Sequence, residues 1–303
     1  METQAVRRTV QKKKKDWTVL ELINWTAGYL SEKDVDSPRL TAERMLGHVL
    51  ECRRLDLYLQ FDRPLDPSDL EAYKRLLKQR AQGCPLQYVL GETEFFSLPF
   101  KVRPPVLIPR PETETLVEKV LNRLQAVEGT PVVADIGTGS GNIAVSLAHA
   151  LDTMQVYATD ICPDALCLAM ENARHHGVAE RIVFLEGDLM EPLEEAGAYD
   201  TFHAIVCNPP YIRRNALSAL PIEIREYESP LALDGGPDGL QFYQRLAMEA
   251  GLFLRSEGWL AVEVGDGQAE AVQKILHRHP EWGIIQVEQD LNGIERVIVA
   301  EKW

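Results

Sequence analysis

The segment Asn208-Pro209-Pro210-Tyr211 directly follows the apolar run 202–207, and its residue types suggest a specific chemistry. Proline fixes φ and has no backbone N–H, so two consecutive prolines remove two donors. Each proline also favours an extended conformation for the residue before it. We therefore expect a rigid strand end that presents the Asn208 side-chain oxygen and the Pro209 carbonyl to a planar –NH2 group. The alternative is an ordinary proline turn after a strand. We call residues 208–211 the NPPY loop.

A second motif upstream is rich in glycine. It consists of Gly137, Thr138, Gly139, Ser140 and Gly141. A β-branched run at 131–136 precedes it, and a run with helical character at 142–148 follows. Strand, glycine turn and helix in this order are the context that a cofactor-binding turn requires, because glycine lets a ligand approach the backbone closely. We expect all five residues of this turn, 137–141, to contact a cofactor.

Two acidic residues end the next two strand-like runs. The run 156–159 leads to Asp160, whose carboxylate can accept hydrogen bonds from ribose hydroxyls. The run 181–186 leads to Asp188 and Leu189. We expect the Asp188 carboxylate to accept from an adenine amino group and Leu189 to cover the ring, although an ordinary Gly-Asp turn explains the same residues.

The spacing of the glycines narrows the choice of cofactor. Asn142 stands at the position where the dinucleotide pattern G-x-G-x-x-G has its third glycine, which disfavours a pyrophosphate on the helix N-terminus. A ligand with ribose and adenine but no phosphate fits better, and S-adenosylmethionine (AdoMet) is such a ligand. Asp160, Asp188 and Asn208 all follow strands, where open α/β sheets bind ligands, so we expect Asn208 to contact the cofactor too.

Together these residues resemble the class I AdoMet-dependent methyltransferases that modify amino groups. Over nearly its whole length the chain is similar to the HemK/PrmC family of peptide chain release factor glutamine methyltransferases. Further segments that carry the resemblance are LIPRPETE at 107–114, EYESP at 226–230, LDGGPDGL at 233–240, GWLAVEVG at 258–265 and DLNGIERV at 290–297. The RPETE part discriminates best, and its Arg110 and Glu112 would brace the cleft wall or form a linker ion pair. One departure is Leu189, where some relatives carry Trp.

The resemblance implies a Rossmann-like, seven-stranded methyltransferase sheet with an antiparallel last strand. It also implies methyl transfer from AdoMet to the side-chain amide nitrogen of the glutamine in the Gly-Gly-Gln motif of class 1 release factors. Asn208, Pro209 and Tyr211 would be catalytic, with Tyr211 packed on the amide plane, and all four residues of the NPPY loop would bind the substrate. A small N-terminal helical domain would dock the release factor.

Three other functions share parts of these motifs. Adenine-N6 methyltransferases of DNA or RNA and ribosomal-protein glutamine methyltransferases use the same NPPY loop. A non-catalytic AdoMet-binding adaptor is the third, and the presence of both intact motifs speaks against it.

Charge argues against a nucleic-acid substrate. The formal net charge is −14, and residues 1–16 carry six basic and two acidic side chains, so the remaining chain has a net charge of −18. An acidic surface is unsuited to broad contact with phosphates, so we expect no direct nucleic-acid substrate.

The cysteines and histidines indicate the cellular compartment and bear on whether a metal site is present. Five cysteines without C-x-x-C spacing favour a reduced cytoplasm, and seven unclustered histidines predict no metal site. No apolar run approaches the ~20 residues of a membrane span, and the basic start lacks the apolar segment of a secretory signal. We expect a cytoplasmic monomer with no membrane contact.

The expected domain organisation follows from the apolar periodicity and from the positions of glycine and proline. Apolar spacing predicts helices at 17–30, 38–50 and 67–81. Residues 1–85 should form the helical docking domain, with a basic, disordered arm at 1–16. Residues 86–111 should form a β-hairpin that turns at Gly91-Glu92, followed by a proline-rich linker. Residues 112–303 alternate helix and strand and end in two strands around Asn292-Gly293, which predicts an α/β methyltransferase domain.

Overall fold

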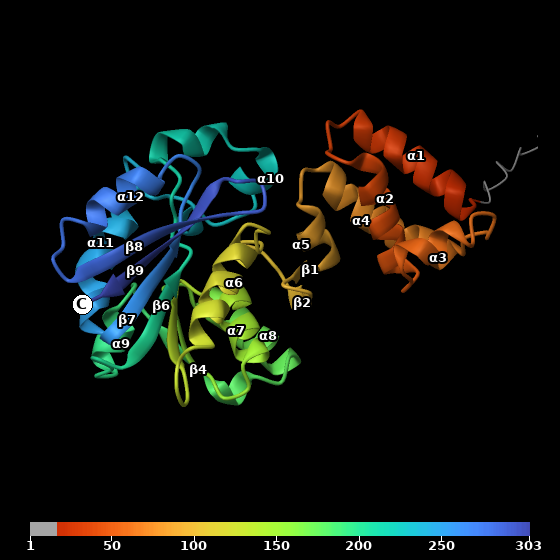
Figure 1. Ribbon diagram of the computed structural model, residues 1–303. Helices are drawn as coiled ribbons and strands as arrows, with labels where there is room; N and C mark the ends of the chain where they lie inside the picture. The colour runs from red at the N-terminus through yellow and green to blue at the C-terminus, as the bar shows by residue number, and fades with distance from the viewer. Residues whose placement is uncertain (1–16) are drawn as a thin grey trace, which may run out of the picture. The chain divides into compact units, whose positions relative to one another are not determined.

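The computed structural model describes residues 17–303, and the chain divides into two compact units (Figure 1). The first unit ends at Leu90, and the second runs from Gly91 to Trp303. The basic arm expected at 1–16 lies outside the described residues. Among residues 17–303 no helix is both long and apolar enough to span a bilayer.

The first unit contains five helices in its described part. They are α1 (Val19–Ser31), α2 (Pro38–Val49), α3 (Arg54–Tyr58), α4 (Pro67–Ala81) and α5 (Leu86–Leu90). Thr18 and Glu21 form a capping box that begins α1, and Pro38 and Pro67 occupy the first helical turns of α2 and α4. The buried side chains of Ile23 and Tyr73 share one core. The three predicted helices are confirmed, and the five-residue α3 was not predicted.

The predicted hairpin turn at Gly91-Glu92 is wrong. Residues 86–90 form helix α5, because Val89 donates to the Pro85 carbonyl and buries its side chain in the core of the first unit. The hairpin instead pairs β1 (Glu92–Phe95) with β2 (Leu98–Lys101) and turns at Phe96-Ser97, both with positive φ. Neither residue is the glycine or asparagine that usually marks such a turn, and a five-residue apolar run fits helix and strand equally well.

The second unit is built on one seven-stranded sheet. Its strands are β3 (Val132–Ile136), β4 (Gln155–Asp160), β5 (Ile182–Glu186), β6 (Phe202–Cys207), β7 (Leu254–Glu263), β8 (Trp282–Gln289) and β9 (Glu295–Lys302). They lie in the order β5-β4-β3-β6-β7-β9-β8. Strands β5, β4, β3, β6 and β7 run parallel to one another, and β9 pairs antiparallel with both β7 and β8. The predicted seven-stranded sheet with an antiparallel last strand is confirmed.

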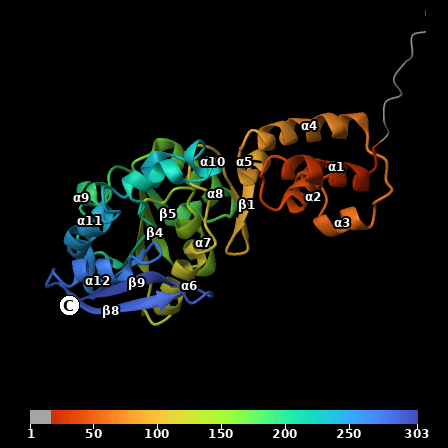
Figure 2. The ribbon, with the colours of Figure 1, turned by 90° about the horizontal axis from the view of Figure 1, so that it is seen from above.

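Helices cover both faces of this sheet, as Figures 1 and 2 show. The helices are α6 (Thr113–Leu124), α7 (Asn142–Ala150), α8 (Pro163–His175), α9 (Glu191–Glu195), α10 (Ile222–Arg225), α11 (Gln241–Glu249) and α12 (Ala269–Leu276). The helices α6, α7 and α8 pack with the β1–β2 hairpin on one face, and α9, α11 and α12 pack on the other. Each face has its own apolar core, so the strands are buried on both sides, as parallel strands require.

The strand order places a topological switch point between β3 and β6. From β3 the chain adds β4 and β5 on one side, and then returns to add β6 and β7 on the other. In parallel register, the last residue of β3, Ile136, lies beside the last residue of β6, Cys207. The turn 137–141 and the NPPY loop therefore start next to each other, at the point where open α/β sheets bind ligands.

The proline-rich segment expected as an interdomain linker packs within the second unit instead. Val106 and Ile108 are almost fully buried, and the Pro105 carbonyl accepts a hydrogen bond from Ser229 N at 3.0 Å. Proline stiffness thus supports a wall of this unit.

A large-to-small change on α6 tests the sheet packing. Leu116 is fully buried between α6 and the sheet, so Leu116→Ala should lower the free energy of unfolding by about 2–5 kcal/mol, because it leaves a cavity. Leu291 is fully exposed, and Leu291→Ala should change it by less than about 0.5 kcal/mol. Urea unfolding monitored by circular dichroism measures both, and equal effects would contradict this packing.

Candidate functional site

One cavity of the second unit lies at the carboxyl ends of β3, β4, β5 and β6 and holds about 1160 Å³ of space, its open mouth included. The predicted site residues that line it are Gly137, Thr138, Gly139, Ser140, Asp160, Asp188, Leu189, Asn208, Pro209 and Pro210. Residues far apart in the sequence thus meet around one space. Gly141 and Tyr211 were also predicted as contacts, and they do not line it.

The turn 137–141 is held open by its backbone. Gly137 N and Thr138 N both donate to the Thr159 carbonyl, at 2.9 and 2.8 Å. Gly137 and Gly139 have positive φ, and no atom would lie within 4 Å of a Cβ on either. Their bare backbone therefore borders free space, as a closely approaching ligand requires.

Gly141 lies close to a neighbouring helix. A Cβ at this position would lie 3.0 Å from the Cβ of Ala169, and φ is +81°. Gly141 precedes the first residue of α7, and Ala169 is on α8. A glycine is therefore required here for close helix packing, and the residue does not face the cavity.

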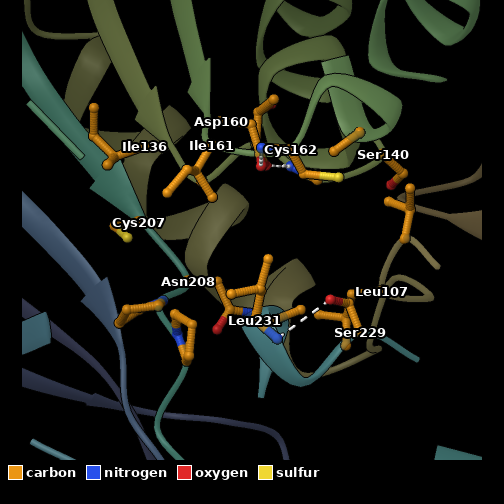
Figure 3. A pocket seen from close by; sticks show the side chains of 18 of the residues that line it. Leu107, Ile136, Ser140, Asp160, Ile161, Cys162, Cys207, Asn208, Ser229 and Leu231 are labelled. Carbon is orange, nitrogen blue, oxygen red and sulfur yellow. Dashed lines mark hydrogen bonds between the residues drawn. The ribbon is translucent and has the colours of Figure 1, made fainter. Parts of the chain in front are cut away.

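Asp160 supports the turn and also faces the cavity. One carboxylate oxygen accepts from Gly139 N at 2.8 Å. The other accepts from Cys162 N at 2.9 Å, and Figure 3 shows this hydrogen bond. Burial raises the pKa of Asp160, and the backbone donors partly counter this. Each carboxylate oxygen has a second lone pair, so both can still accept from a ligand hydroxyl.

Asp188 has a partner that the sequence did not reveal. Its carboxylate accepts from Arg245 Nη1 of α11 at 2.7 Å. The following residue, Leu189, has a positive φ of 48°, and its carbonyl accepts from the buried Thr159 hydroxyl at 3.2 Å. Phe242, also on α11, adds an aromatic side chain to the cavity wall.

Asn208 ends a chain of side-chain hydrogen bonds. Its Nδ2 donates to Thr113 Oγ1 at 3.0 Å, and the Thr113 hydroxyl donates to Glu263 Oε2 at 2.6 Å. Thr113 and Glu263 are only 1% and 2% exposed, and Thr113 also lines the cavity. Burial raises the pKa of Glu263 to about 7, and the Thr113 hydrogen bond partly counters it. In Figure 3 Asn208 lies at the cavity, across from Asp160.

The rest of the NPPY loop is held through its backbone. Gln268 Nε2 donates to the Tyr211 carbonyl at 3.1 Å. The residue after the loop, Ile212, donates its N–H to the Leu233 carbonyl and accepts from Gly235 N. The Tyr211 ring packs against the apolar core of the α11–α12 face instead of lining the cavity. Burial raises the pKa of Tyr211 to about 12.

Arg110 stiffens the opposite wall. Its Nη2 lies 2.5 Å from Glu228 Oε2, and Glu228 is buried. Burial raises the pKa of Glu228, while Arg110 opposes that rise. The ion pair joins the RPETE and EYESP segments, and Arg110 itself lines the cavity, whereas Glu112 does not.

Sequence reasoning missed Arg245, Gln268, Glu263 and a role for Thr113. For Glu263 there was a signal, because a carboxylate stands inside the apolar run 260–264. A buried charge there requires a specific partner. Arg245 lies on α11 and Gln268 directly precedes α12, and neither stands in a distinguishing local pattern.

Comparison with known proteins adds independent findings. Residues 21–91 match the PrmC N-terminal domain family, and residues 112–223 match the methyltransferase small domain family. The release factor glutamine methyltransferase of Geobacter sulfurreducens is 45% identical over 282 residues, which cover 93% of this chain and 96% of that protein. The protein of the same name from Chlorobaculum tepidum is 42% identical over 287 residues, with the same coverage of both chains.

Among solved structures, the hMettl16 catalytic domain in complex with MAT2A 3'UTR hairpin 1 superposes with a TM-score of 0.54. The match covers 75% of this chain and 81% of that chain at 17% identity. This similarity concerns the methyltransferase fold alone.

The buried Glu263 carboxyl predicts a pH-dependent stability. Its pKa is about 7 in the folded chain, against an ordinary value of 4.5. The folded state therefore binds more protons between these values, so this group's contribution to stability is full below about pH 4.5 and is lost as pH rises through about 7. Relative to the unaltered chain, Glu263→Gln should be more stable at pH 8 than at pH 5, by on the order of 2–3 kcal/mol.

Urea unfolding of both chains at the two pH values measures this difference. Glu301→Gln, which changes a partly exposed carboxylate on β9, is the matched control. The same offset for Glu263→Gln at both pH values would show that Glu263 does not titrate in this range.

Proposed function

The chain belongs to the release factor glutamine methyltransferase family, and from this membership we propose that it methylates a glutamine side-chain amide of a peptide chain release factor, with AdoMet as the methyl donor. We assign the glutamine to the Gly-Gly-Gln motif of class 1 release factors. The observation that carries the proposal is the acceptor pair of the NPPY loop: Asn208 and Pro209 line the same cavity as the glycine turn and Asp160.

The residues of the cavity fit AdoMet. Free space borders the backbone of Gly137 and Gly139, and Asp160 has lone pairs for ribose hydroxyls. Asp188 and Leu189 would hold the adenine, with Phe242 as a further apolar neighbour. When bound, AdoMet supplies a methyl group activated on a sulfonium.

The NPPY loop would orient the nucleophile. An amide nitrogen is a weak nucleophile because its lone pair is delocalised into the carbonyl. Asn208 Oδ1 and the Pro209 carbonyl would accept its two N–H bonds and hold it towards the methyl group. As the nitrogen gains positive character these hydrogen bonds strengthen, which stabilises the transition state more than the ground state.

The cavity supports this mechanism without a strong base. None of the described residues that line it is a histidine, and burial raises the pKa of the Cys207 thiol well above its ordinary value, so this thiol stays protonated. We infer catalysis by orientation and electrostatics. Tyr211, expected on the amide plane, would act by supporting the loop through its packed ring.

The first unit would dock the release factor away from the reacting glutamine. Its α1 presents Trp25, which is half exposed and stacks on Tyr29 with ring centroids 5.5 Å apart. Exposed aromatic side chains are typical of protein interfaces.

We assign the protein to the cytoplasm, because the substrate takes part in translation and all five cysteines are free thiols. We propose that it acts as a monomer.

Removing the Asn208 amide tests the proposal. Asn208→Ala should lower kcat by about 10²–10³-fold, as for the loss of one preorganised polar group, and affinity for AdoMet should fall less. Asn122→Ala, on an exposed position of α6, is the matched control. Transfer of label from tritiated AdoMet to a purified release factor measures kcat, and mass spectrometry maps the modified residue.

Near-normal turnover by the Asn208→Ala protein would remove Asn208 from the mechanism. Label in DNA or RNA but none in the release factor would favour adenine methylation instead.

A surface change tests the docking role. Trp25→Ala should raise KM for the release factor about tenfold and leave kcat nearly unchanged, because the side chain would contribute only to binding. Leu291→Ala, an exposed apolar change in the second unit, is the control. An unchanged KM would exclude the Trp25 surface from substrate binding.

A further inference from the structure

The hydrogen-bond chain from Glu263 through Thr113 to Asn208 joins three elements at one point. Asn208 follows β6, Glu263 ends β7, and Thr113 begins α6. Because Cys207 pairs in register with Val262, the next residues, Asn208 and Glu263, lie side by side at this edge of the sheet. The Thr113 hydroxyl lies between them, 3.0 Å from Asn208 Nδ2 and 2.6 Å from Glu263 Oε2.

The direction of these hydrogen bonds follows from the number of protons that each group carries. An ionised carboxylate only accepts hydrogen bonds, so the single proton of the Thr113 hydroxyl is directed to Glu263. The Thr113 oxygen can then only accept from Asn208, and it selects the –NH2 edge of that amide. The two edges of an asparagine amide have nearly the same shape, so a partner of fixed polarity is needed to choose between them.

We propose that Thr113 and Glu263 are positioning residues that hold the Asn208 amide with its oxygen, and not its nitrogen, directed to the substrate nitrogen. This inference rests on the proposed function, and it assigns roles to two residues that act through Asn208. The reversed amide would present an –NH2 group to the –NH2 group of the substrate, with two donors facing each other.

We call the two hydrogen bonds that join Asn208, Thr113 and Glu263 the relay. The side chains of Thr113 and Glu263 are almost fully buried, which limits competing partners, and Thr113 also lines the cavity. Charged groups act on Glu263 only through space: Glu112 disfavours its ionised form, and Arg110 and Arg296 favour it. Cys207, Tyr211 and Tyr243 also face this carboxyl from β6, the NPPY loop and α11.

Protonation of Glu263 would reverse the relay. A protonated carboxyl can donate to the Thr113 oxygen, which releases the hydroxyl proton to the Asn208 oxygen and turns the amide. Since burial places the pKa of Glu263 at about 7, turnover should rise as pH increases through this value.

A double-mutant cycle between Thr113 and Asn208 tests the relay. Thr113→Val keeps the shape and removes the hydroxyl, so kcat should fall about 10–100-fold with little change in KM for AdoMet. In an Asn208→Ala background the same change should cost less than about twofold, because the amide that it orients is gone. Thr113→Ser, which keeps the hydroxyl, should recover most of the loss.

The pH profile of kcat provides a second readout. The unaltered chain should show a rise around pH 7 that is absent in Glu263→Gln and in Thr113→Val. Thermal unfolding of each variant controls for folding, and Thr113→Ser keeps the test decisive if Thr113→Val is unstable.

Additive losses in the double-mutant cycle, or no recovery in Thr113→Ser, would overturn the relay. So would an unchanged pH profile in Glu263→Gln. These outcomes are distinct from a failure of the proposed function, in which the unaltered chain itself would transfer no methyl group to a release factor.

Discussion

The parallel register of β3 and β6 is the constraint on which the rest of the site depends. Ile136 and Cys207 lie side by side at the ends of these strands, and parallel neighbours are only about 4.8 Å apart. The glycine turn and the NPPY loop must therefore start at adjacent points on one edge of the sheet. A shift of this register would separate the cofactor residues from the acceptor pair.

Backbone hydrogen bonds keep this edge rigid. Gly137 and Thr138 bind the Thr159 carbonyl, and Asp160 binds Gly139. On the other side, Gln268 holds the Tyr211 carbonyl. The loops gain order from the strands that carry them, which agrees with a mechanism based on orientation, because misplacing reacting groups by about 1 Å is costly in rate.

Buried polar groups near the site have an energetic cost. Burial raises the pKa of both Asp135 and Glu263 to about 7, and Asp135 Oδ1 has no hydrogen-bond partner in the described part of the chain. An apolar residue at position 263 would suit the surrounding core better. The proposed orientation of Asn208 explains a carboxylate at this position, because functional sites commonly retain residues that lower stability but fix a required geometry.

The sequence by itself determined the features that depend on neighbouring residues. It indicated the strand ends, the glycine turn, the NPPY loop and the alternation of helix and strand, because these follow from periodicity, glycine and proline over a few positions. The number of strands in the sheet was implied by the family resemblance. Only the tertiary structure decided that residues 86–90 form a helix, that Gly141 serves helix packing and that Tyr211 does not line the cavity. The orientation of Asn208 also belongs to the tertiary structure, because Thr113 is 95 residues from Asn208 and 150 residues from Glu263. Hydrogen bonds over such separations leave no local pattern, since only the folded sheet brings their partners together.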